Sequence, residues 1–409
     1  MFRGFKNLPK AIKLWATGVV LFVSLALPVA AQDEQYRSDQ ELWDAALSAV
    51  KDGDFQRALA PLEILVNRDP DNIDYRFELA LALSKVDNYA RAKHHLTQLR
   101  STQLSYGARQ AVNSVLAEID DSNPLTGYLS FSLLPESNVN RQTDNETIII
   151  GGLPFRLNTT RQPGVSLQAN AGIAYSAKLD DRLTARFRLD LSGKFNKAIA
   201  YRDIAAIART GLSFTNKTQS TYEGGLIFGQ RWSAAKSYSQ TTGLYFDHGR
   251  PSGARGYFNL NTKLTKTKHI SGAPDHDIGF VQLSYTHGIS ANAQITASAF
   301  HQIAKSTDLT AAGQTTGVSV SGTYAFRGGL ITGLTLSHSV DEREGFSPFF
   351  FKEPRKDRKT RLDISIHHRN IRIGAFAPQL LMGLERNQSN NVLADYTNKY
   401  VSFGLTRNF

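Results

Sequence analysis

Apolar and polar residues alternate over segments of about ten residues from Thr126 to the end of the chain. In the clearest segment, residues 183 to 195, Leu, Ala and Phe dominate one set of alternate positions. The other set includes the charged residues Arg186, Arg188, Asp190 and Lys194. A face with so many charges cannot be a protein core, and the opposite face is too apolar to meet water. A strand with one face toward lipid and the other toward an aqueous lumen satisfies both requirements.

Fourteen such segments predict a closed transmembrane β-barrel, because bacterial single-chain barrels have an even number of strands. Another of these segments carries Arg361 and Asp363 on its polar face. The segments start near residues 127, 166, 182, 204, 220, 239, 256, 277, 292, 315, 329, 359, 377 and 396. Connections after the second, fourth, eighth and tenth segments are tight, and those after the first and eleventh are long. Since short turns face the periplasm, we expect both chain ends on that side.

The last strand ends in a pattern that many outer-membrane barrels share. Its apolar face consists of Val401, Phe403, Leu405 and the terminal Phe409, with polar or small residues between them. This resemblance implies recognition by the barrel-assembly machinery. A soluble β-sandwich strand that ends on Phe is the alternative, and the export signal described below disfavours it.

Residues 32 to 124 follow a helical period instead. Four positions recur at an offset of 34 residues, which is the length of a tetratricopeptide repeat. These positions hold Phe55, Ala58, Leu62 and Leu65 in the first repeat, and Tyr89, Ala92, Leu96 and Leu99 in the second. We expect the first repeat to end just before Pro70, and a capping helix over residues 106 to 119. A plain helical bundle with a chance period is the alternative. We expect His94 and His95 to lie on a solvated face, because no carboxylate completes a metal-ligand set.

The first 31 residues predict export. Basic residues precede an apolar stretch from Leu14 to Leu27, and small residues end the segment at Ala31, as in a cleaved signal peptide. Residues 32 to 124 carry 10 basic and 16 acidic side chains, a net charge of −6, whereas residues 125 to 409 carry 33 and 20, a net charge of +13. We therefore expect a periplasmic tetratricopeptide-like domain over 32 to 124 and an outer-membrane barrel over 125 to 409.

Several classes of chemistry have no signal in the chain. The sequence contains no cysteine, which excludes a structural disulfide, a thiolate nucleophile and a Cys-ligated zinc site. It also contains no phosphate-binding P-loop and no G-x-S-x-G nucleophile elbow. We expect no enzyme activity, no cofactor, no bound metal and no nucleic-acid partner.

The combination of a short helical-repeat domain with a fourteen-stranded barrel resembles the surface lipoprotein assembly modifier family of Gram-negative outer-membrane translocons. Two parts of the chain look like segments of that family: Pro135 to Arg141 after the first strand, and the last hairpin, with Arg386 to Asn391, Tyr396 and Gly404 to Phe409. The resemblance implies that the helical domain engages a client, a surface lipoprotein or related secreted protein, and that the barrel assists its transfer to the surface. Folding of the client outside, or hand-off from periplasmic chaperones, would then supply the energy. This chain departs from the family because its helical domain is small and has only two clear repeats.

Two long connections carry candidate contacts. The connection from Asp341 to Arg358 joins aromatic and cationic residues, namely Phe346, Phe349, Phe350, Phe351 and Arg355. They are candidates for holding a client or docking on anionic lipopolysaccharide, with an aromatic girdle at the membrane interface as the alternative. The connection from Leu134 to Gly164 is long enough to fold into the pore.

A passive or selective porin is the competing function. A barrel of net charge +13 favours anions, including acidic polysaccharide on its way out. The lumen charges are compatible with both functions, because they either keep a pore hydrated or pair across strands and close it. The short helical domain argues against polysaccharide export, since exporters of that class have longer repeat arrays.

Overall fold

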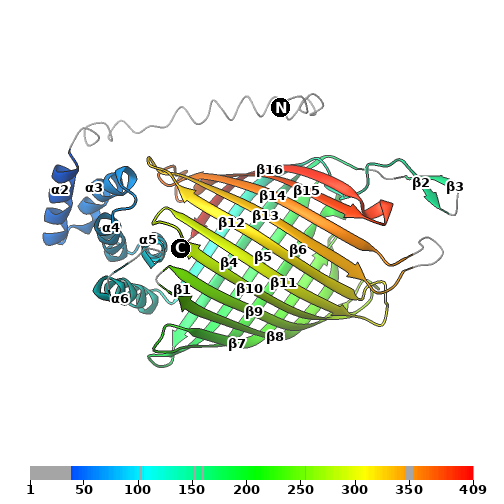
Figure 1. Cartoon of the computed structure of the whole chain (residues 1–409), viewed down its shortest axis with the longest axis horizontal. Helices are drawn as coiled ribbons and strands as arrows, with labels where there is room; N and C mark the ends of the chain where they lie inside the picture. Colours follow the sequence, from blue (N-terminus) through cyan, green and yellow to red (C-terminus); the bar gives the residue numbers. More distant parts are fainter. Residues whose placement is uncertain are drawn as a thin grey trace.

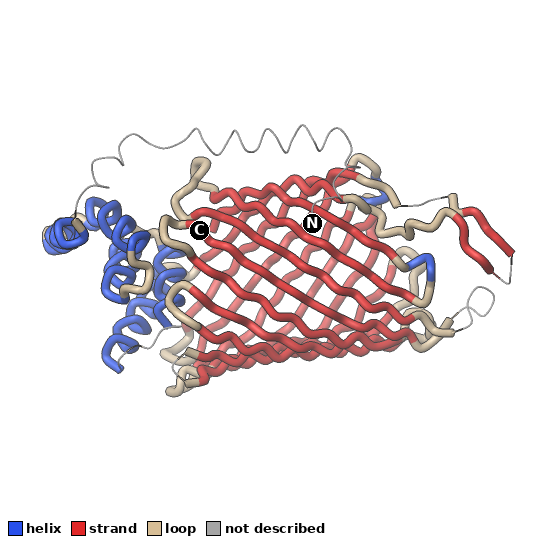
Figure 2. The backbone as a smooth tube through the Cα atoms, turned by 45° about the horizontal axis from the view of Figure 1, so that its top comes forward, coloured by secondary structure: helices blue, strands red, loops and turns tan. Residues whose placement is uncertain are grey.

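The computed structural model describes residues 38–100, 104, 106–150, 153–158, 161–253, 255–346 and 353–408. The predicted signal peptide, the terminal Phe409 and the loop residues Phe349, Phe350 and Phe351 lie outside this described part. Helices α2 to α6 gather beyond one rim of a long β-barrel in both views (Figure 1, Figure 2). No helix among the described residues is long and apolar enough to cross a membrane.

Fourteen antiparallel strands form the closed barrel, which confirms the predicted fold class. They are β1 (Leu125–Glu136), β4 (Gly164–Lys178), β5 (Leu183–Asn196), β6 (Asp203–Thr215), β7 (Thr221–Ser233), β8 (Lys236–Ser252), β9 (Gly256–His269), β10 (His276–Gly288), β11 (Ala293–Lys305), β12 (Gly313–Ala325), β13 (Leu330–Arg343), β14 (Lys356–His368), β15 (Ala377–Ser389) and β16 (Tyr396–Asn408). Strand β1 pairs with both β4 and β16 and so closes the barrel. The largest differences from the predicted starts occur at β8, which begins at 236 rather than 239, and at β14, which begins at 356 rather than 359.

The alternation in the sequence decides which side chains face lipid. On β5, Phe187 is 42% exposed and Leu191 is 44% exposed, as expected for side chains that a lipid bilayer covers. The charged residues at the alternate positions of the same strand turn to the other side of the sheet, where Arg186 and Lys194 form ion pairs. The strand is therefore apolar on the outer wall and charged on the lumen wall.

The described part of the long connection after β1 lines the inner wall at its start, where Arg141 pairs with Glu385, and then leaves the barrel. It contains a small hairpin of β2 (Thr147–Ile150) and β3 (Leu153–Arg156), which forms a separate two-stranded sheet. The hairpin projects beyond the barrel rim opposite to helices α2 to α6 (Figure 1). Short 3-10 helices η3 (Ile199–Tyr201) and η4 (Val392–Ala394) lie in two other connections on that side.

The helical part comprises α2 (Asp39–Lys51), α3 (Phe55–Arg68), α4 (Ile73–Lys85), α5 (Tyr89–Arg100) and α6 (Tyr106–Ser122). Helices α3 and α5 begin 34 residues apart, and the turns before them use left-handed backbone at Gly53 (φ 76°) and Asp87 (φ 60°), again 34 residues apart. The chain leaves α3 at Arg68, and the Asn72 side chain caps the start of α4, so Pro70 lies in the turn between them. The two units therefore share the left-handed turn before the helix as well as the sequence period.

Six of the eight repeat positions are completely buried, and all of them except Leu65 belong to the hydrophobic core of the helical part. The six are Ala58, Leu62, Leu65, Ala92, Leu96 and Leu99. Phe55 and Tyr89 pack against this core while staying partly exposed. The buried set therefore stabilises the helix packing and leaves the outer helix faces free for contact with other molecules.

Candidate functional site

The structure gives each of the six predicted lumen charges a polar partner. On the periplasmic half, Glu223 of β7 accepts from Arg186 at 2.7 Å and lies 3.7 Å from Arg188. Glu223 is 6% exposed and also accepts a hydrogen bond of 3.0 Å from the Tyr245 hydroxyl. Lys194 pairs with Glu136 of β1. These ion pairs link side chains of different strands across the lumen wall.

Two further lumen charges are held by tyrosines that cross a glycine. Tyr128 of β1 reaches over Gly172 of β4 and donates a 3.0 Å hydrogen bond to Asp190 of β5. A Cβ atom on Gly172 would lie 2.2 Å from the Tyr128 ring, so the glycine is what lets the ring pass. Sequence reasoning missed this arrangement, although a glycine in an alternating strand often marks such a close approach.

The same arrangement recurs on the other side of the closing strands. Tyr400 of β16 lies over Gly383 of β15 and donates to Asp363 of β14, which also pairs with Arg361 at 2.6 Å. A Cβ atom on Gly383 would lie 2.1 Å from Tyr400. The two tyrosines thus flank the junction of β1 and β16, where the barrel closes.

A polar cluster, buried except for Arg141, ties the outer ends of β1 and β16 together. Glu136, Asn138, Arg141 and Tyr396 come from the stretches that resemble the family, and Glu385 and Asn398 complete the cluster. Asn138 donates its backbone N–H to Asn398 at 3.0 Å, and Asn398 donates to Glu136 at 3.1 Å. Arg141 pairs with Glu385 at 3.2 Å, and the Tyr396 hydroxyl donates to the same carboxylate at 2.7 Å. Asn138 and Asn398 are fully buried, so this end of the closure is tightly held.

The helical part is held at the opposite, periplasmic end. Arg76 of α4 donates at 3.1 Å to Asn292 in the turn between β10 and β11. Asn67 of α3 accepts from two other turns, through its carbonyl oxygen from the Gly328 N–H at 3.2 Å and through Oδ1 from Arg369 at 3.3 Å. The helices therefore stand across the mouth of the barrel and contact three of its turns.

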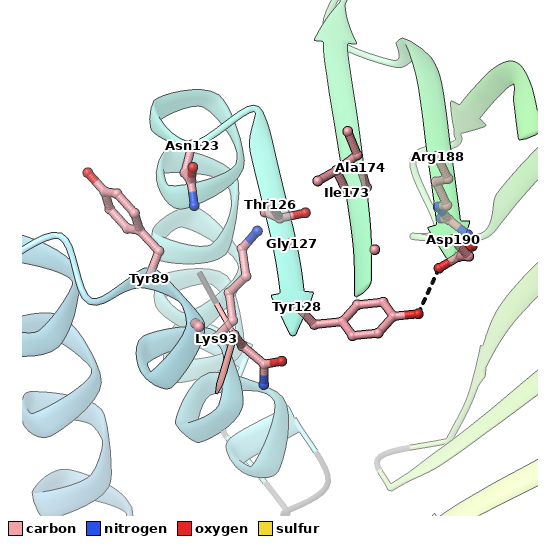
Figure 3. A pocket seen from close by; sticks show the side chains of 13 residues that line it. Tyr89, Lys93, Asn123, Thr126, Gly127, Tyr128, Ile173, Ala174, Arg188 and Asp190 are labelled. Atoms are coloured by element: carbon pink, nitrogen blue, oxygen red, sulfur yellow. Dashed lines mark hydrogen bonds between the residues drawn. The ribbon is translucent and has the colours of Figure 1, made fainter. Parts of the chain in front are cut away.

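A cavity of about 350 Å³ lies where α5 meets the start of the barrel. Tyr89 and Lys93 of α5 line one side, and Tyr128 and Asp190 line the other (Figure 3). Lys93 itself pairs with Asp120 of α6 at 2.6 Å. The cavity connects the inner face of the helices with the lumen wall beside β1.

His94 is exposed, as expected, whereas His95 is not on a solvated face. His95 is 1% exposed, and burial, followed by the charges of His94 and Arg76, lowers its pKa well below 6.5. Helix α5 is covered on more than one face because it packs on α4 and α6 and also faces the barrel mouth. No group of three or more metal-ligating side chains occurs within the described ranges.

The predicted surface-loop contacts are only partly described. Phe346 is 36% exposed at the end of β13. Arg355 pairs with Asp357 through Nε at 2.9 Å, so it holds the base of the loop. On the closing strand, Val401, Phe403 and Leu405 follow the alternation, and Phe403 lies beside Leu133 of β1.

Comparison with known proteins adds the family. The profile of the family described as surface lipoprotein assembly modifier matches residues 126–409. The chain is 23% identical over 397 residues to surface lipoprotein assembly modifier 1 of Haemophilus influenzae, covering 90% of this chain and 77% of that protein. It is 22% identical over 390 residues to the surface lipoprotein assembly modifier of Pasteurella multocida, covering 89% and 76%.

Solved structures resemble the barrel only in outline. A Pseudomonas aeruginosa FadL homologue has a TM-score of 0.40 at 9% identity, covering 70% of this chain and 90% of the other. The outer-membrane protein OmpT of Vibrio cholerae, in a form lacking loop L8, has a TM-score of 0.37 at 8% identity, covering 70% and 100%. The closed barrel and the family place the protein in the outer membrane, with its helical domain in the periplasm. Since the family profile matches most of its length, the chain belongs to the surface lipoprotein assembly modifier family.

Proposed function

We propose that this protein receives a surface lipoprotein in the periplasm and passes it through the barrel lumen to the cell surface. The observation that carries the proposal is the position of the helical domain, which contacts three turns at the periplasmic mouth. A client held by these helices is already beside the only aqueous path that a closed barrel offers. The names of the relatives supply the class of client.

The lumen wall supports passage of a polypeptide. Fourteen strands enclose more space than the eight-stranded barrels whose interiors are filled by side chains. Polar residues such as Ser192 and Asn170 line this wall beside the ion pairs described above. An extended chain can exchange its hydrogen bonds with water for bonds to such a wall.

The role we propose is transfer without catalysis. Folding of the client outside the cell, or hand-off from periplasmic chaperones, would make the transfer directional. The two helical units present outer faces to the periplasm, while their buried core residues only maintain the packing. We therefore place client contact on the exposed helix faces and on the cavity between α5 and the barrel.

Protease shaving of intact cells tests this function. Cells that lack the protein should retain its client lipoprotein in the periplasm, where external protease cannot cut it. Re-expression of the full chain should restore cleavage at the surface, while an unrelated outer-membrane protein is cleaved equally in both strains. A client that stays fully accessible without this protein would contradict the proposal, and a steady anion current through the purified protein would favour a porin.

A further inference from the structure

Positive charge is concentrated where the helical domain meets the turn between β14 and β15. Arg76 of α4 and Arg91 of α5 face Arg369 and Arg372 of that turn. Among the described residues, the acidic side chains whose charges act on Arg76, Arg369 and Arg372 are Asp71 and Glu63. Only Arg91 has a direct ion pair, with Glu63 at 2.6 Å.

The floor of this cluster contains buried nitrogen atoms without hydrogen-bond partners. They are Nε and Nη2 of Arg369, Nε of Arg76 and Nδ1 of His95. Arg76 is 0% exposed and His95 is 1% exposed. A buried donor without an acceptor is costly, more so when it is charged, and an arriving anion would remove that cost.

The two unpartnered atoms of Arg369 are those with which other arginines of this protein hold carboxylates. Arg231 uses Nε and Nη2 to hold Asp203, at 2.9 and 2.6 Å. Arg361 uses the same edge for Asp363, at 2.6 and 3.1 Å. Arg369 uses only Nη1 for a side-chain hydrogen bond, to Asn67 at 3.3 Å, so this carboxylate-binding edge has no partner.

The cluster has an open side. Arg372 and His94 are exposed at its rim, Arg369 is half-buried, and Arg76 and His95 form the floor. Burial, and then the charge of Arg369, lowers the pKa of Arg76 to about 10, which agrees with crowding of like charges. Because Nε and Nη2 of Arg369 are themselves buried, we expect an anion to bind first beside the exposed Arg372 and to reach Arg369 through a local shift of the side chains that cover it.

We propose that Arg369 and Arg372 form a binding site for carboxylates of an acidic polypeptide segment, at the junction of the helical domain and the barrel. The segment belongs to the client, so this inference rests on the proposed function. The location favours a polypeptide over a lipid headgroup, because the cluster lies between the helices and the turns at the mouth. Side-on pairing with Arg369 and a second contact from Arg372 give the site its preference for successive acidic residues.

Binding of a fluorescent hexaglutamate peptide to the purified full chain in detergent tests the site without any client. We expect saturable binding that weakens as salt rises, and no binding of hexalysine. The double variant R369Q/R372Q should lower affinity at least tenfold, whereas R369K should retain part of it. The matched control is R57Q, because Arg57 is an exposed arginine paired with Asp52 on the far side of the helical domain.

Three other results would each contradict the proposed binding site. Equal binding by the wild type and R369Q/R372Q would remove the site. Competition by inorganic phosphate at equal carboxylate concentration would make it a small-anion site, and preferential binding of phosphatidylglycerol vesicles over the peptide would make it a lipid site. Protease shaving of the wild type tests the proposed function separately, so that function can stand while this site fails.

Discussion

At the scale of single residues, Glu223 is an acceptor shared by three side chains of the periplasmic lumen wall. It holds Arg186, Arg188 and Tyr245, and it is 6% exposed. Glu223→Leu should destabilise the barrel by about 1–3 kcal/mol, because two partly buried guanidinium groups lose their acceptor. The temperature at which the barrel loses its compact mobility on denaturing gels measures this change. Asp181→Asn, at a side chain that is 99% exposed, is the control and should change nothing.

Glycines beneath tyrosines are the second residue-scale feature. Gly172→Ala places a Cβ atom 2.2 Å from the Tyr128 ring, so the ring must move away from Asp190. We expect a loss of about 1–3 kcal/mol in barrel stability, as for other overpacked sites. Gly279→Ala is the matched control, because its nearest neighbour would lie at 3.7 Å. Equal gel-shift temperatures for both variants would mean that the tyrosine contact does not stabilise the barrel.

His95 makes the helical domain sensitive to acid. Its folded-state pKa is lowered well below 6.5 by burial. Just below pH 6.5, the unfolded chain therefore binds a proton at this histidine and the folded chain does not. Stability is therefore full above about pH 6.5 and falls as the pH drops below it. Urea unfolding followed by Trp43 fluorescence, with Trp232 replaced by Phe, should show a lower midpoint at about pH 5.5 than at about pH 7.5. His95→Gln should reduce that difference, and an unchanged difference would contradict this assignment.

At the scale of elements, the sequence period accounts for the helices and strands because it reports burial on one face. Strand alternation located all fourteen barrel strands, and the period of 34 located both helical units. The hairpin of β2 and β3 was missed, since its strands are four residues long and Ile149 is 76% exposed. The docking contacts were also missed, because Asn67, Asn292 and Arg369 are ordinary polar residues until the fold brings them together.

Packing of the helical units yields a prediction at this scale. Leu62→Ala removes a fully buried side chain from the contact between helices and should cost the helical domain about 2–5 kcal/mol. Leu47→Ala, at a side chain that is 39% exposed, should cost much less. Both are measured by urea unfolding with the Trp43 signal. Similar losses for the two variants would argue against the buried repeat core.

At the scale of the whole molecule, a helical domain stands across one mouth of the barrel. Near the other mouth, buried polar contacts hold together the seam between the first and last strands. The seam holds Glu136, Asn138 and Asn398 in one network, so the wall is continuous where first and last strands meet. The proposed function therefore predicts that a client crosses through the lumen rather than through the wall. The sequence alone could not predict which residues would contact a client. The side chains that line the lumen and the way the helices dock both depend on contacts between distant segments.

The most direct test of this route is a photo-crosslink to a client stalled during export. Ser192 and Leu191 are adjacent on β5 and point to opposite faces, so p-benzoylphenylalanine at Ser192 probes the lumen and at Leu191 probes the lipid side. A client fused to a tightly folded domain supplies the stalled intermediate. The account predicts crosslinks from position 192 and none from position 191. Crosslinks from 191 alone, or from neither position while the client still reaches the surface, would contradict passage through the lumen.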